Sequence, residues 1–153
     1  MGKDCCSENL IEIRILEAIR KLLSKRVNEL LAGFEYPIPL IEFCDYRGIS
    51  AVIPEIALSS CERSEKERII LLDSYSVTVT FSLPESPESE LYCYAYAGAV
   101  GRAIYDDPTL GGVVDRAVVT GKKYVKPKHS HCGESWKAEI TLRVTVETIS
   151  DGE

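Results

Sequence analysis

The clearest pattern in the chain is a strict alternation of apolar and polar residues near its C-terminal end. From position 136 to 147 every second residue is apolar, and the residues between them are charged or threonine. A strand has a side-chain period of two, so this segment predicts a strand with one buried and one polar face. Its apolar set is Trp136, Ala138, Ile140, Leu142, Val144 and Val146. Another long strand is predicted over residues 69–82, because positions 77–82 alternate in the same way.

Two other segments have the spacing of helices. Apolar residues recur every three or four positions over residues 8–32, with Ser7 and Gly33 as candidate caps, so we expect an amphipathic helix that covers a sheet. A second helix is predicted over residues 88–105, with an apolar line of Leu91, Val100 and Ile104. Small residues crowd its middle, namely Ala95, Ala97, Gly98, Ala99, Gly101 and Ala103. Such a thin face lets a neighbouring backbone come close, either the chain's own sheet or another copy of the chain.

A tight turn is predicted directly after the second helix. Pro108 stops the helix because it lacks an N–H and crowds the preceding turn, and the next glycines permit backbone angles that side chains disfavour. Branched residues then favour a strand over residues 113–125. We interpret the turn as a structural hinge that fixes the angle between a helix and a sheet. Its residues are Asp107, Pro108, Thr109, Leu110, Gly111 and Gly112.

The remaining segments complete an α+β pattern. Residues 49–58 predict a strand that Pro54 places at an edge or bulge, whereas residues 59–66, 84–89 and 126–135 predict loops. The order of elements predicts a mainly antiparallel sheet packed against an N-terminal helix and a second, central helix. Residues 1–153 are expected to form a single domain, with flexible ends at 1–7 and 149–153.

Composition narrows the function classes. The chain has 153 residues, of which 45% are hydrophobic and 27% charged, and its net charge of −6 argues against specific nucleic-acid binding. No stretch reaches the roughly 18 apolar residues of a membrane helix, and no signal-peptide pattern occurs, so we expect folding in the cytoplasm. Without a CxxC pair, the cysteines are expected to be reduced and mostly small core residues. They are Cys5, Cys6, Cys44, Cys61, Cys93 and Cys132.

One loop contains residue types that carry chemistry. His129, His131 and Cys132 could offer two imidazoles and a thiolate to zinc, but no fourth ligand has a recognisable spacing. Cys132 also adjoins His131 in sequence, which seldom gives the facing geometry of a nucleophile and its base. We therefore expect an exposed hairpin loop, no metal or other cofactor, and no enzymatic activity. A small metal- or thiol-dependent enzyme that uses these three residues is the alternative.

The helix end and the turn Asp107-Pro108-Thr109-Leu110-Gly111-Gly112 resemble a segment of the tail terminator proteins of tailed bacteriophages, also called tail completion or minor tail proteins. The match in sequence covers residues 95–119 and the closing strand, and the order of elements is similar over most of the chain. The resemblance implies a structural virion protein that forms a ring, typically a hexamer, on the tail tube. The ring stops tube polymerisation and provides the surface on which the head docks.

The resemblance also implies partners and a location. The expected partners are further copies of the chain, the tail tube protein and a head–tail connector protein, with no membrane and no specific nucleic-acid binding while DNA passes through the ring. The expected location is the virion tail of a phage or prophage, after assembly in the host cytoplasm. Another head–tail connector or neck protein is the nearest alternative. The candidate contacts with neighbouring subunits or tube protein are Glu62, Arg63, Glu65, Lys66, Lys122, Lys123, Lys126 and Lys128.

Overall fold

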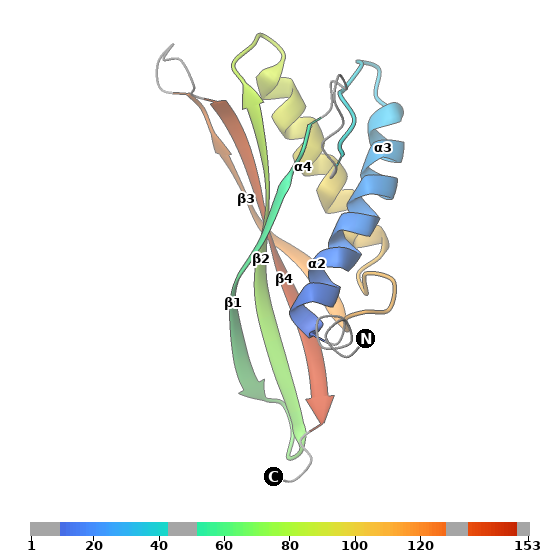
Figure 1. Cartoon of the computed structure of the whole chain (residues 1–153), viewed down its shortest axis with the longest axis vertical. Coiled ribbons are helices and arrows are strands. Elements are labelled where there is room, and N and C mark those ends of the chain that lie inside the picture. The colour runs from blue at the N-terminus through green and yellow to red at the C-terminus, as the bar shows by residue number, and fades with distance from the viewer. Residues whose placement is uncertain (1–9, 43–51, 128–134, 150–153) are drawn as a thin grey trace, which may run out of the picture.

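A four-stranded antiparallel sheet, in the order β1-β2-β4-β3, carries all the helices on one of its faces (Figure 1). The computed structural model describes residues 10–42, 52–127 and 135–149. Its elements are α2 (Ile11–Leu22), η1 (Leu23–Val27), α3 (Asn28–Ala32), β1 (Glu55–Glu65), β2 (Ile70–Pro84), α4 (Ser89–Asp106), β3 (Arg116–Val125) and β4 (Ser135–Ile149). The predicted α+β class is confirmed.

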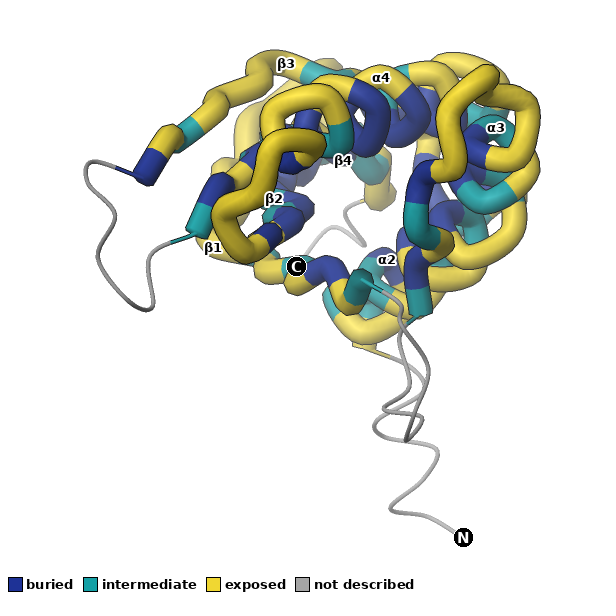
Figure 2. Tube along the Cα trace, turned by 90° about the horizontal axis from the view of Figure 1, so that it is seen from above, coloured by how far each residue is buried: buried dark blue, intermediate teal, exposed yellow. Residues whose placement is uncertain are grey.

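The centre of the sheet is the ladder between β2 and β4, the two predicted alternating strands. The strands pair over their whole lengths, and residues such as Phe81 and Ala138 face each other on the buried side. Figure 2 shows the buried positions on the inner sides of the strands and helices. The other side of the same strands carries mainly serine, threonine and charged residues, with Ile70, Leu72 and Ile149 at one end, and no described helix packs against it.

The N-terminal helix is one continuous rod made of α2, η1 and α3. It ends at Ala32, directly before Gly33, as predicted, whereas its expected start and the candidate cap Ser7 lie outside the described residues. Its buried stripe repeats every four residues: Ile15, Ile19, Leu23, Val27 and Leu31. A stripe with that spacing drifts around an α-helix of 3.6 residues per turn. The wider π-helical turn of η1 counteracts the drift and keeps the stripe on the core.

Helix α4 packs against β2, β3 and β4 and also against η1 and α3, which are the neighbours of its thin face, whereas α2 contacts β1 directly. Ala97 and Ala103 are fully buried there, and Tyr96 stacks on Phe81 with ring centroids 4.7 Å apart. The Tyr96 hydroxyl donates a hydrogen bond of 2.6 Å to the carbonyl of Pro39, so this buried polar group has a partner. The buried alanines of the thin face therefore serve packing within the chain, whereas Gly98 is exposed.

Two sequence expectations, about Leu91 and about the start of β3, differ from the structure. Leu91 is 40% exposed, so the apolar line of α4 includes Val100 and Ile104 but not Leu91. Of the two cysteines among the described residues, Cys93 is buried, which raises the pKa of its thiol to about 11, and Cys61 is exposed on β1. The strand predicted from Val113 begins at Arg116, because the N–H groups of Val113 and Val114 still bind the Thr109 carbonyl in the turn.

A larger difference concerns β1. Residues 59–65 are strand rather than loop, and the strand starts at Glu55, just after Pro54. The segment is an edge strand that pairs only with β2, and most of its side chains are exposed. Its sequence therefore shows no alternation of apolar and polar residues. Strand β1 lies at an edge, in line with Pro54, and a register shift between Leu58 and Ser60 marks a bulge that the sequence does not predict.

The residues of the predicted hinge, 107–112, form a tight turn directly after α4. Helix α4 ends at Asp106, and Leu110, Gly111 and Gly112 have φ angles of 52°, 73° and 90°. The Gly111 N–H donates to the Asp107 carboxylate at 3.2 Å. The Pro108 carbonyl accepts the N–H of Ala117 at 2.7 Å, which fastens the turn to the start of β3. In the described stretches of chain, no helix combines the length and apolar character needed to cross a membrane.

The hinge predicts opposite effects of one substitution at different glycines. We expect Gly111→Ala and Gly112→Ala each to lower the free energy of unfolding by about 1–2 kcal/mol, because alanine strains a positive φ. Gly98→Ala is the matched control, since a Cβ there meets no atom within 4 Å in helix α4. It should raise the free energy of unfolding by about 0.5–1 kcal/mol. Urea unfolding measures the free energy of unfolding of all three variants. A change of the same sign at Gly98 as at Gly111 and Gly112 would contradict the role of the positive φ angles.

Candidate interaction surface

The two predicted contact segments lie at opposite edges of the sheet. Glu62, Arg63 and Glu65 are in edge strand β1, and Lys66 follows its last residue. Lys122 and Lys123 are in the other edge strand, β3, and Lys126 follows it. The structure therefore separates the two sets instead of joining them into one patch. Lys128 and the candidate metal ligands His129, His131 and Cys132 lie outside the described residues.

Two of the predicted contacts on the β1 side are engaged within the chain. Arg63 donates to both carboxylate oxygens of Asp73, from Nε to Oδ1 at 2.6 Å and from Nη2 to Oδ2 at 2.9 Å. Asp73 is a buried acid on the core face of β2, and Arg63 holds its pKa below the ordinary value. Lys66 forms an ion pair with Glu147, which raises the lysine pKa. These two cations stabilise the fold of the hairpin.

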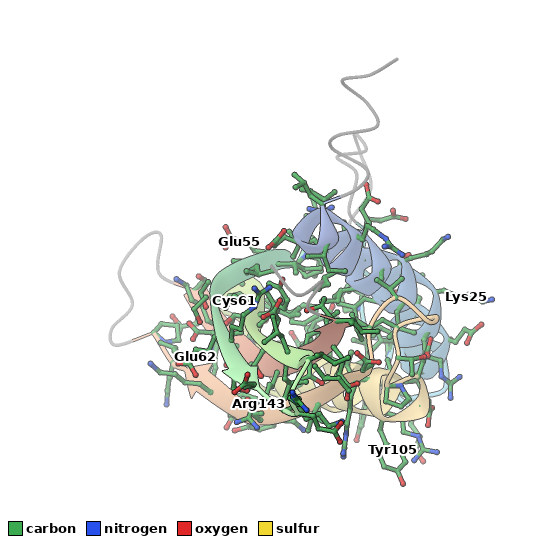
Figure 3. All side chains as sticks on the ribbon, turned by 90° about the horizontal axis from the view of Figure 1, so that it is seen from below. Lys25, Glu55, Cys61, Glu62, Tyr105 and Arg143 are labelled. Carbon is green, nitrogen blue, oxygen red and sulfur yellow. The ribbon has the colours of Figure 1, made fainter. Side chains whose placement is uncertain are left out.

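The charge left on edge β1 is acidic. Its eleven residues include three glutamates, at positions 55, 62 and 65, and its single cation is Arg63, which Asp73 neutralises. All three glutamates are exposed, and none forms an ion pair with another described residue. Figure 3 shows Glu55, Cys61 and Glu62 along this strand, away from Tyr105 at the end of α4. Edge β1 is thus an exposed strand with negative charge.

The other edge is basic. The ten residues of β3 include Arg116, Lys122 and Lys123 and no acid. The Lys122 ammonium lies over Gly101 of α4, where an added Cβ would be 3.6 Å from the Nζ atom. Tyr124 packs edge-to-face on Tyr94 with a centroid distance of 5.0 Å, and both rings stay partly exposed. Aromatic side chains such as tyrosine are enriched at protein interfaces.

Two grooves flank the hinge. A groove of about 820 Å³ lies between the N-terminal helix and the turn, and Arg26 spans it by binding Asp106 at 2.9 Å. That contact is the main cause of the lowered pKa of Asp106, and it ties the π-helical turn to the end of α4. The second groove, of about 460 Å³, runs beside edge β3 and is lined by residues that include Ile104, Pro108 and Val119.

Within the described residues, no group of three or more histidine, cysteine, aspartate or glutamate side chains is arranged to hold a metal ion. The sequence pattern does not predict two contacts that stabilise the structure: the Arg63–Asp73 pair and the Arg26–Asp106 pair. Asp73 did give a signal, because a lone acid in a buried position of an alternating strand needs a partner. Arg26 gave none, since it is one of several cations on an exposed helix face.

The fold and this surface define an α+β protein whose sheet has one covered face and two exposed edges of opposite charge. Compared with protein-family models and with curated protein sequences, the chain matches none.

The buried acid on β2 predicts a pH-dependent stability. Asp73→Asn should lower the free energy of unfolding at neutral pH by at most about 1 kcal/mol, because the half-exposed Arg63 is screened by solvent. A lowered folded pKa stabilises the protein above the unfolded value of about 3.9, and this stabilisation is lost as the pH falls through the folded value.

Urea unfolding between neutral and acid pH measures this contribution. The difference between wild type and Asp73→Asn should shrink as the pH drops below 4. Glu65→Gln, at an exposed acid of β1, is the control and should change the stability by less than about 0.5 kcal/mol at any pH. A difference that persists unchanged in acid would contradict the role of Asp73.

Proposed function

We propose that the protein is a structural subunit of a phage or prophage tail, which joins copies of itself in a ring that caps the tail tube. The observation that carries the proposal is the pair of exposed sheet edges, one acidic and one basic. An exposed edge strand offers unpaired backbone groups to another chain. A ring requires two different, complementary patches on each subunit, and these edges supply them.

The hinge supports the same proposal. The residues that resemble tail terminators, 107–112, fix α4 against the sheet and place the Pro108 carbonyl on β3. They therefore control the position of one of the two edges relative to the helices. The further partners that follow from the resemblance are the tail tube protein and a head–tail connector. The role is structural: the ring ends tube polymerisation and forms the docking surface for the head.

Light scattering coupled to size-exclusion chromatography tests the proposal, with the protein alone and with purified tail tube protein. We expect a defined oligomer, hexameric by analogy with the terminators, and tubes whose growth stops when the protein is added. A monomer at every concentration, with and without tube protein, would overturn the proposal. Binding to connector protein but not to tube protein would assign the chain to the neck instead.

A further inference from the structure

The pairing registers place charges of opposite sign at matching heights on the two edges. Followed across the sheet, the row that starts at Glu55 passes through Thr80 and Glu139 and ends at Lys123. The row that starts at Glu62 passes through Ser74 and Thr145 and ends at Arg116. All four charged side chains are exposed and lie on the face that the helices leave uncovered. One edge thus matches the other at two positions at once.

The two edges also share their irregularities. The bulge of β1 falls between Leu58 and Ser60, and that of β3 falls between Val119 and Gly121. Leu58 and Val119 belong to the same row of paired residues, so the bulges of the two edge strands begin at the same position along the sheet. The number of residues between Glu55 and Glu62 is therefore the same as between Arg116 and Lys123, and each of these two spans contains one bulge.

From these registers we infer that edge β1 of one subunit docks beside edge β3 of the next copy, head to tail, in the register that continues the rows. The inference rests on the proposed self-association and names its contact. Three antiparallel pairings separate β1 from β3, so the two edges run in opposite directions. A neighbour displaced along the sheet thus presents β1 antiparallel to β3, as in every pairing within the subunit.

In that register Lys123 lies beside Glu55 of the next copy and Arg116 beside its Glu62. Directly opposed residues have Cβ atoms about 4.5–5.5 Å apart, which is close enough for ion pairs. The carbonyl of Pro108 already accepts the Ala117 N–H, so main-chain pairing is available only beyond Ala117 and Arg116 acts through its side chain. Leu58 of the next copy shares a row with Val119 and reaches the apolar groove beside β3.

The test reverses the charges of each edge separately. Glu55→Lys with Glu62→Lys makes both edges basic, and Arg116→Glu with Lys123→Glu makes both acidic. Either double variant should raise the dissociation constant of the subunit contact at least about tenfold, because like charges then meet. Lys137→Glu with Arg143→Glu is the matched control, since both residues are exposed on the same face of the inner strand β4. Light scattering across a concentration series measures each.

Mixing the two double variants gives the decisive result. Each contact in the mixture then joins an acidic edge to a basic one, so oligomers that neither variant forms alone should return, with the two variants alternating. Equal assembly of wild type and both variants, or a mixture that stays dissociated, would overturn the edge contact while leaving a ring built elsewhere. A monomeric wild type, with and without tube protein, would instead overturn the proposed function.

Cysteine crosslinking covers the case in which a reversed variant does not fold. Glu55→Cys with Lys123→Cys should give intermolecular disulfides under mild oxidation, because the two positions share a row in the part of β3 where main-chain pairing is available. Glu55→Cys with Arg116→Cys is the control and should crosslink at no more than the wild-type level, since its positions lie in different rows. Equal crosslinking of the two pairs would overturn the register.

Discussion

Burial of one face of the β2–β4 ladder is the constraint on which the rest of the structure depends. These two strands pair over fifteen residues each, and every second side chain from Tyr75 to Leu83 and from Trp136 to Val144 is buried. A slip of one residue would turn the whole apolar set to the uncovered face, so the register is strongly fixed. The helices must then cover that face: α4 packs on β2, β3 and β4, and α2 packs on β1.

The turn at residues 107–112 positions edge strand β3 relative to α4 and the core. Helix α4 is held by the Phe81–Tyr96 stack, and Arg26 binds its last residue, Asp106, from the π-helical turn. The left-handed backbone at Leu110, Gly111 and Gly112 then reverses the chain within a few residues. The Pro108 carbonyl binds the start of β3, so the edge strand and α4 are positioned by one short segment. The position of this edge relative to α4 is therefore set by that turn.

The sequence predicted the elements whose burial leaves a periodic trace. Strands β2 and β4 were found because one face of each is apolar, and the turn was found because proline and glycine have few alternative uses at those positions. Strand β1 was missed over residues 59–65 because both of its faces remain exposed, so no alternation marks it. The order of the strands could not be predicted either, since it depends on which alternating strands pair. Without that order, the predicted contacts Glu62 and Lys123 could not be assigned to opposite edges.

The distribution of charge also discriminates between kinds of assembly. In a twofold dimer that joined β1 to β1, the glutamates at positions 55 and 62 of one subunit would face the same glutamates of the other. In a β3–β3 dimer, Arg116 and Lys123 of one subunit would face the same cations of the other. Like charges on facing strands are destabilising, so both symmetric pairings are disfavoured. The same charges favour the pairing of unlike edges, and such a contact leaves one acidic and one basic edge unused at the ends of every open chain of subunits. If subunits associate through that contact, closure into a ring would pair every edge, whereas a contact that does not close would continue as a filament.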